Sequence, residues 1–383
     1  MDYTGFLQAL HEELLRSDGS GKKQIIQFPD SGEYRKCMSL AKKLQSKLPM
    51  LAHIKKLKLI HAISCTLRPS ANIHHPGLRL LVEDDSVMKV HAAPAAPPGV
   101  KSVIVPESGL PWGVRQVRAH QVWNKSMGSR IRIAVIDTGI DYQHPDLKTS
   151  VSYGINLINR SMLPYDDNGH GTHIAGIIAA ANHSSGILGV APRASIHAVK
   201  AFDRHGTAFI SDIIRGIDWA VQNGIHVINM SFGMKYRSSA LLEAVRNAYQ
   251  SGVIIVASSG NDGKRTTIDY PARFPQTIAV GAINREQKIA SFSNRGKYID
   301  IYAPGDKIMS TWTRGKYHEL SGTSMATSHV SGVIALLLAQ YPAMKPADIK
   351  AALIKSAVRL RSKRELDKGR IDATRVFRYM SNG

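Results

Sequence analysis

The sequence predicts an α/β protein built on a mostly parallel, twisted sheet with helices on both faces, preceded by a small α+β domain. In residues 112–383, short apolar runs alternate with longer segments of helical periodicity, the pattern of repeated strand and helix units. A hydrophobic content of 43% is enough for a sizeable core. The predicted strands are 131–136, 196–201, 226–232, 253–259, 277–284 and 298–303, and the predicted helices are 171–181, 209–223, 238–251, 324–341 and 346–357.

Residues 1–93 predict a separate small domain with the element order β, α, β, α, β, which is typical of a ferredoxin-like, split βαβ sandwich. Its elements are a strand at 23–28, an amphipathic helix at 33–48, one or two strands within 54–67, a short helix at 76–81 and a last strand at 87–91. Residues 94–111 follow as a linker, because their Pro-rich and Ala-rich start favours an extended chain.

Three glycine-rich segments of the larger domain each carry a residue that catalysis can use. Asp137 ends an apolar strand, His170 lies between Gly169 and Gly171, and Ser324 follows Gly322-Thr323. A hydroxyl activated by an imidazole, which a buried carboxylate holds in one tautomer, makes a nucleophilic triad. Taken singly, the Asp also fits a turn or a helix cap, and the His also fits a helix cap. Together, the three segments favour a catalytic site.

All three segments, in the order Asp, His, Ser, resemble the subtilisin-like serine proteases, and the resemblance extends over essentially all of residues 112–383. It implies a serine endopeptidase that works through an acyl-enzyme. Ser324 would be the nucleophile, His170 the general base and acid, and Asp137 the residue that orients His170, while His173 would be structural.

An oxyanion also needs fixed hydrogen-bond donors. Asn261 follows the strand at 253–259 and matches the oxyanion-hole asparagine of the family, although Asn after Gly is also a common turn signal. The backbone N–H of Ser324 would be the second donor.

The resemblance also implies where a substrate peptide binds, as an added strand between two exposed segments, although either segment could be an ordinary loop. The matched residues are Gly206, Ala208, Ser231, Gly233, Ser258 and Gly260.

Asp262 and Asp269 match positions that border the primary specificity pocket of the family. A partly desolvated carboxylate there would attract a Lys or Arg side chain, so we predict basic residues immediately before the scissile bond, with Lys101 as one self-cleavage point. Alternatively, the two carboxylates face solvent or pair with a neighbouring cation, namely Lys264, Arg265 or Arg273.

Its place upstream of such a domain makes the region 1–93 similar to the family's propeptide, a folding chaperone and inhibitor whose tail lies in the active site. This predicts a self-processing precursor that is cut between His91 and Gly109 and is inhibited by its own N-terminal domain. An unrelated N-terminal domain is the alternative.

The chemistry requires no cofactor, but members of the family commonly bind structural calcium. Asp146 matches one carboxylate ligand, and residues 181–187 match a segment that supplies carbonyl oxygens. His183 and Ser108 stand where the family provides amide oxygens, and calcium needs about six to eight oxygen ligands. We therefore expect a calcium site that is weak or absent.

The net charge and the targeting signals of the sequence indicate possible partners and a localisation. The formal net charge of +21 favours contact with polyanions, so a non-specific anionic polymer is a candidate partner, and a solvated basic surface is the alternative. Residues 1–17 lack the apolar core of an export signal, and the longest apolar run, 330–339, is too short to span a bilayer. These features predict a cytoplasmic protein without a membrane partner, in which Cys37 and Cys65 stay reduced, and release by an unusual route is the alternative.

Two other functions use the same pattern. A non-catalytic relative with this fold could serve as a binding or regulatory protein, but such a protein is expected to lack a triad or oxyanion residue, and all four are present. Peptide transfer or cyclisation would use the same acyl-enzyme as hydrolysis.

Overall fold

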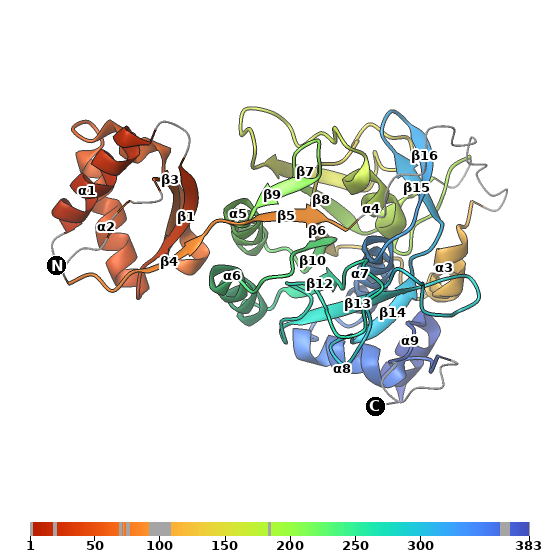
Figure 1. Cartoon of the computed structure of the whole chain (residues 1–383). Helices are drawn as coiled ribbons and strands as arrows, with labels where there is room; N and C mark the ends of the chain where they lie inside the picture. Colours follow the sequence, from red (N-terminus) through yellow and green to blue (C-terminus); the bar gives the residue numbers. More distant parts are fainter. Residues whose placement is uncertain are drawn as a thin grey trace.

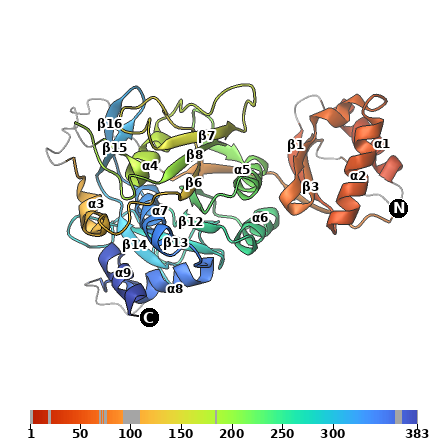
Figure 2. The ribbon, with the colours of Figure 1, turned by 180° about the vertical axis from the view of Figure 1, so that it is seen from behind.

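The computed structural model of the chain describes residues 3–17, 21–68, 71, 73, 77–91, 109–182, 185–360 and 368–382. It has a small N-terminal α+β domain and a larger α/β domain, which stand side by side in Figure 1 and, from the opposite side, in Figure 2. The strand β5 (Val87–Val90) runs from the small domain into the large one.

A seven-stranded parallel sheet forms the centre of the large domain, in the order β14-β13-β12-β10-β6-β8-β7. The predicted fold class is therefore confirmed. The edge strand β7 is not among the predicted strands, because only one of its residues is buried and it lacks a continuous apolar run. The strands are β6 (Arg132–Asp137), β7 (Val151–Asn156), β8 (Ser195–Lys200), β10 (Val227–Met230), β12 (Ile254–Ser258), β13 (Thr277–Ile283) and β14 (Ile301–Pro304).

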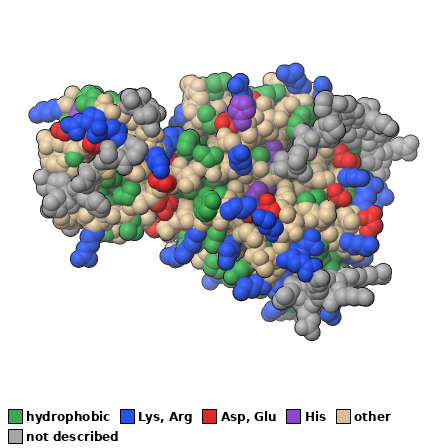
Figure 3. All heavy atoms as spheres, in the orientation of Figure 1, with side chains coloured by type: hydrophobic (Ala, Val, Ile, Leu, Met, Phe, Trp, Pro, Cys, Tyr) green, Lys and Arg blue, Asp and Glu red, His purple; other side chains and the backbone are tan. Residues whose placement is uncertain are grey.

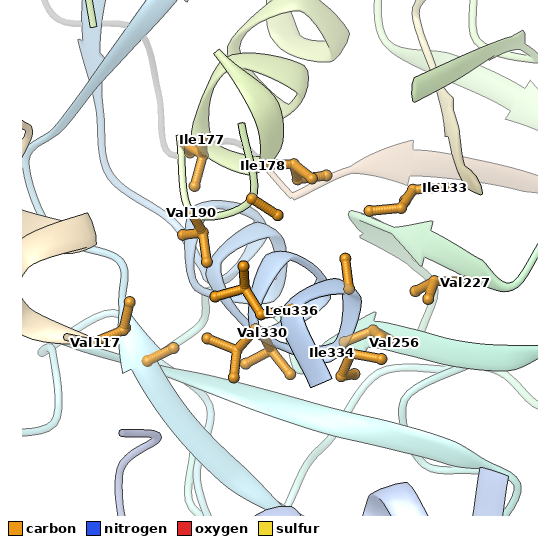
Figure 4. Packing of buried hydrophobic residues seen from close by; sticks show 14 of the residues in the cluster. Val117, Ile133, Ile177, Ile178, Val190, Val227, Val256, Val330, Ile334 and Leu336 are labelled. Atoms are coloured by element: carbon orange, nitrogen blue, oxygen red, sulfur yellow. The ribbon is translucent and has the colours of Figure 1, made fainter. Parts of the chain in front are cut away.

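Helices cover both faces of this sheet. Along β6, Ile133 and Val135 pack in one apolar cluster with α4 (His170–Ala179) and α7 (Thr323–Gln340). Figure 4 shows this cluster from close by. Ala134 and Ile136 point the other way and pack with α5 (Ile210–Gln222) and α6 (Ser239–Gln250). Strict alternation along the strand thus gives each face its own core.

The remaining elements of the large domain are short. Their bounds are α3 (Trp112–Gln116), β9 (Thr207–Phe209), β11 (Phe232–Gly233), β15 (Ile308–Trp312), β16 (Lys316–Leu320), α8 (Pro346–Ser356) and α9 (Ala373–Ser381). The predicted helices agree with α4 to α8 to within two residues at each end, whereas α9 and the β15–β16 hairpin were not predicted. None of the helices that the structure describes is long and apolar enough to cross a membrane.

The N-terminal domain has an antiparallel sheet in the order β2-β3-β1-β4, which is the strand order of a split βαβ sandwich. Two helices pack against it over a core that contains the buried free thiols of Cys37 and Cys65. The elements are α1 (Tyr3–Arg16), β1 (Lys22–Gln27), α2 (Ser31–Leu44), β2 (Lys55–Leu57), β3 (Ala62–Leu67) and β4 (Leu81–Asp84).

The second helix that the sequence predicts for this domain is wrong. The short helix expected at 76–81 is not formed in the described part of that range, and Leu81 instead begins β4, where it pairs with β1. The helix α1, which was not predicted, covers the sheet next to α2. Its side chains supply the apolar surface that the missing second helix would have provided.

The predicted last strand of the small domain belongs to a sheet of the large one. β5 lies between β9 and β11 and pairs with both in antiparallel fashion. Its Met88 is completely buried in the core of the large domain. The short strands β9 and β11 each expose an edge, so an extended segment that lies between them satisfies backbone groups on both sides.

Lys and Arg side chains lie over both domains on the face that Figure 3 presents. The Lys and Arg side chains behind the positive net charge are therefore not confined to one domain.

Candidate active site

Asp137 and His170 meet above the carboxyl edge of the sheet, because Asp137 ends β6 and His170 begins α4. Nδ1 of His170 lies 2.7 Å from Oδ1 of Asp137, and both side chains are buried. The same carboxylate oxygen accepts the backbone N–H of Thr138 at 2.8 Å. Since a carboxylate only accepts hydrogen bonds, it holds the proton of His170 on Nδ1 and leaves Nε2 as a base.

Ser324 is the second residue of α7, but its hydroxyl does not contact His170. It donates instead to the carbonyl oxygens of His91, at 2.8 Å, and Ser231, at 3.0 Å. Nε2 of His170 is buried and has no hydrogen-bond partner among the described residues. The structure therefore joins two members of the predicted triad, while the chain at His91 engages the third.

Asn261 lies just beyond β12, and its side chain is held in one orientation. Its Oδ1 accepts hydrogen bonds from both the backbone N–H and the hydroxyl of Thr323, each at 2.9 Å. Nδ2 then points at the carbonyl oxygen of His91, 2.9 Å away. The predicted second donor, the N–H of Ser324, makes no hydrogen bond to this oxygen among the described residues; the hydroxyl of Ser324 does so instead.

The backbone of Gly322 lies close to the carbonyl group of His91. A Cβ atom there would lie 2.8 Å from the carbonyl oxygen of His91 and 3.2 Å from Nδ2 of Asn261. Only glycine therefore leaves room for a carbonyl group between Asn261 and Ser324.

Four of the predicted substrate-binding residues flank the segment 87–91. The N–H of Val90 donates to the carbonyl of Gly206 at 3.1 Å, and the N–H of His91 donates to the carbonyl of Ser231 at 2.9 Å. Ala208 and Gly233 are the register partners of Met88 and Lys89, respectively. The segment occupies these two edges as an added strand.

The imidazole of His91 reaches the predicted specificity residues. Its Nε2 lies 2.9 Å from Oδ2 of Asp269, and its Nδ1 lies 2.7 Å from Oγ of Ser258. Asp269 is 3% exposed and Ser258 is fully buried. We call Gly233, Ser258 and Asp269, which surround this ring, the His91 site.

The cation beside Asp269 is Lys235, which the sequence does not single out. Its ammonium group contacts Oδ1 of Asp269 at 2.7 Å and also binds Asp262. Asp262 therefore reaches the His91 site only through this lysine. Gly260 lies behind the site, and its N–H donates to the hydroxyl of Thr323.

Two further sequence predictions concern His173 and Lys101. His173 is buried, its Nε2 lies 3.1 Å and 3.0 Å from the carbonyl oxygens of Ile308 and His318, and burial lowers its pKa to about 3. It is therefore neutral and structural. Lys101, proposed as a self-cleavage point, lies outside the described residues.

Thr323 and Lys235 are the residues that sequence reasoning missed. Thr323 orients Asn261, and a Thr directly before the nucleophile was the available signal. Lys235 offered no signal, because its partners are 27 and 34 residues away in the chain.

Asp146, the predicted calcium ligand, is surrounded by hydrogen-bond donors. Oδ1 accepts from Nδ2 of Asn182 at 2.8 Å, and Oδ2 accepts from the hydroxyl of Tyr317 at 2.8 Å and from the N–H of Ile187 at 2.9 Å. Both carboxylate oxygens of Asp146 therefore accept hydrogen bonds from protein donors. Among the described residues, no group of three or more His, Cys, Asp or Glu side chains could hold a metal.

The fold and this arrangement define a class of hydrolase with an Asp, His and Ser grouped at the carboxyl edge of a parallel sheet. Residues 128–376 match the model of the subtilase family. The chain is 41% identical to subtilisin E of Bacillus subtilis over 323 residues, 83% of this chain and 81% of that protein. It is 43% identical to subtilisin of Bacillus pumilus over 268 residues, 69% of this chain and 97% of that protein.

A third similar protein is the thermostable alkaline protease of Halalkalibacterium halodurans, 42% identical over 268 residues, 70% of this chain and 73% of that protein. The chain belongs to the subtilase family and is a serine endopeptidase. It needs no cofactor for catalysis and acts on proteins or peptides. None of these findings supports the non-catalytic alternative.

Replacement of Asn261 by Leu removes the amide donor but keeps the size of the side chain. We expect kcat to fall by about 10²–10³, with a smaller change in KM, because the donor acts mainly on the negative charge that develops on the carbonyl oxygen. Steady-state kinetics on one peptide substrate measures both constants. Full turnover in Asn261→Leu would show that another group stabilises the oxyanion.

Proposed function

We propose that Ser324, His170, Asp137 and Asn261 are the catalytic residues of this endopeptidase, and that residues up to His91 are its own inhibitory propeptide. One observation carries the proposal: the carbonyl of His91 lies 2.8 Å from Oγ of Ser324 and 2.9 Å from Nδ2 of Asn261. Both distances are to the carbonyl oxygen: an oxyanion donor must lie at such a distance from it, and the nucleophile must lie beside the same carbonyl group.

In the proposed mechanism, the hydroxyl of Ser324 turns to Nε2 of His170 when a scissile carbonyl is ready for attack. Its proton moves to Nε2, and Oγ forms a bond to the carbonyl carbon. The negative charge on the former carbonyl oxygen is stabilised by Nδ2 of Asn261. Asp137 stabilises the imidazolium ion that forms, and it keeps the ring in place.

The tetrahedral intermediate then collapses as the C–N bond breaks, and the proton on Nε2 passes to the leaving amine. A water molecule repeats these steps on the acyl-enzyme, and it regenerates the hydroxyl of Ser324 and releases the carboxylic acid. The unpartnered, buried Nε2 of His170 is consistent with this role, since it is free to accept a proton.

Contacts outside the active site support the propeptide role. The carboxylate of Glu83 accepts the backbone N–H groups of Ser239 and Ala240 at the start of α6, and that of Asp85 accepts the N–H of Ser211 at the start of α5 at 2.8 Å. Lys55 also pairs with Asp212 at 2.8 Å. Negative charge at helix N-termini is favourable, so the small domain stabilises both helices while its last strand fills the substrate position.

The precursor should cut itself at one bond. We expect hydrolysis between His91 and Ala92, within the predicted interval from His91 to Gly109, because the carbonyl of His91 lies at Ser324. Intact-mass analysis of the purified protein locates the cut. The Ser324→Ala precursor should stay uncut and folded, since the loss is one hydroxyl group. A first cut at Lys101 or later would contradict the assignment of His91.

We also propose that this chain uses hydrogen bonds at Asp146 where its relatives use calcium. Burial and the hydrogen bond to Asp146 raise the pKa of the Tyr317 hydroxyl, so it remains a donor over the physiological pH range. The loop at Gly186 packs closely, and a Cβ there would lie 2.1 Å from Oδ1 of Asp146.

This proposal predicts that EDTA leaves the urea unfolding midpoint of the Ser324→Ala precursor unchanged. Tyr317→Phe in the same background should lower the free energy of unfolding by about 1–2 kcal/mol, because the Asp146 carboxylate loses a buried hydrogen bond. Tyr236→Phe serves as the control, because Tyr236 is 79% exposed. A drop in the midpoint with EDTA that added calcium reverses would overturn the proposal.

A further inference from the structure

The His91 site satisfies both nitrogen atoms of one imidazole ring. Nε2 contacts Asp269 at 2.9 Å and Nδ1 contacts Ser258 at 2.7 Å, and His91 itself is only 9% exposed. The carboxylate can only accept, so Nε2 carries a hydrogen. The hydroxyl of Ser258 can donate or accept, and thus it suits Nδ1 in either protonation state. Burial of the imidazole ring therefore replaces its hydrogen bonds to water with hydrogen bonds to the protein.

Lys235 offsets part of the negative charge of Asp269. Its ammonium group contacts the two carboxylate oxygens of Asp269 at 2.7 Å and 3.1 Å, and it also pairs with Asp262. One ammonium group is thus shared by two carboxylates, and Oδ2 of Asp269 still accepts a hydrogen bond from His91. A Lys or Arg side chain in the same place would have to compete with Lys235 for Asp269 and would lie close to this second cation, which costs energy at short range.

An apolar side chain would meet a different penalty. Phe or Leu would cover Oδ2 of Asp269 and Oγ of Ser258 without replacing the hydrogen bonds of the imidazole. The two atoms would keep only their longer contacts, to Lys235 at 3.1 Å and to the carbonyl of Met230 at 3.5 Å, and the loss of a hydrogen bond by a buried polar group is costly. Sites built to hydrogen-bond a substrate group therefore reject analogues that lack this group.

Glycine backbone sets the width of the His91 site. A Cβ on Gly233 would lie 2.4 Å from Cε1 of His91 and 2.7 Å from its Nε2, so the backbone lies directly against the ring. At Gly260, a Cβ would lie 2.7 Å from Oδ2 of Asp269. A flat ring that ends at Asp269 fits between these surfaces.

From this geometry we propose that the enzyme prefers substrates with histidine immediately before the scissile bond, and that Asp269, which is paired with Lys235, determines this specificity together with Ser258. The inference rests on the proposed function, because it treats His91 as the residue whose carbonyl is attacked. It replaces the sequence prediction, which expected a Lys or Arg side chain before the scissile bond. The substrate class is peptides in which an imidazole precedes the cleaved bond.

The rest of strand β5 defines a suitable probe. Met88 is fully buried and Val90 packs over Gly206, where a Cβ would lie 2.8 Å from Cγ2 of the valine. We would use internally quenched peptides with the sequence of residues 87–96, Val-Met-Lys-Val-Xaa-Ala-Ala-Pro-Ala-Ala, in which Xaa is His, Gln, Lys or Phe. Only the residue before the cleaved bond then differs.

The measured quantity is kcat/KM of the processed enzyme for each peptide, with a fluorophosphonate probe titrating the active sites. We expect the His peptide to exceed the other three at least about tenfold. In Asp269→Asn and in Ser258→Ala, the ratio of the His peptide to the Phe peptide should fall at least about fivefold. Glu286→Gln, the matched removal of an exposed carboxylate, should leave this ratio unchanged.

The two levels of the proposal fail in different ways. If the probe labels Ser324 and the Lys or Phe peptide is cleaved as fast as the His peptide, histidine selection is wrong and the proposed function stands. An unchanged ratio in both Asp269→Asn and Ser258→Ala would likewise overturn the role of the His91 site. If the probe fails to label Ser324 and no peptide is cleaved, the proposed function itself is wrong.

Discussion

Two side chains donate hydrogen bonds to the carbonyl oxygen of His91, and the elements around it fix the positions of both donors. Nδ2 of Asn261 comes from the loop after β12, and the hydroxyl of Ser324 comes from the first turn of α7. Thr323 joins these two elements, since its N–H and hydroxyl both bind Oδ1 of Asn261. The proposed oxyanion donor is thus fixed by a residue adjacent to the proposed nucleophile, which is the preorganisation that transition-state stabilisation requires.

The parallel sheet makes this convergence possible. The carboxyl ends of β6 and β12 lie at one edge, and α4 and α7 both begin there, so residues far apart in sequence meet without long loops. The strand β5 then enters between β9 and β11 and presents the carbonyl of His91. The same pairing would hold a substrate, so the proposed inhibitor and substrate share backbone contacts, and the side chain at the His91 site distinguishes good substrates from poor ones.

Much of this could be predicted from sequence where a local signal existed. Apolar runs and helical periodicity gave the central strands and helices, and the glycine-rich segments identified Asp137, His170 and Ser324 as a group. Edge strand β7 lacked a burial pattern, and α1 replaced a helix expected later in the chain. The ion pair of Lys235 with Asp269 could not be predicted from the sequence. The two residues are 34 positions apart, and only the fold brings them together. The placement of β5 in the larger domain likewise depends on the edges of β9 and β11, and the sequence of β5 does not reveal with which strands it pairs.

The central claim is that Ser324 is a nucleophile whose access is controlled by the strand that ends at His91. The most direct measurement is the rate at which a fluorophosphonate labels Ser324 in the processed enzyme, with and without a synthetic peptide of residues 81–91. Our account predicts labelling at Ser324 alone, with a rate that falls as the peptide concentration rises, because the peptide places its terminal carbonyl beside Oγ. Labelling at another residue, or a rate that the peptide leaves unchanged at saturating concentration, would contradict it.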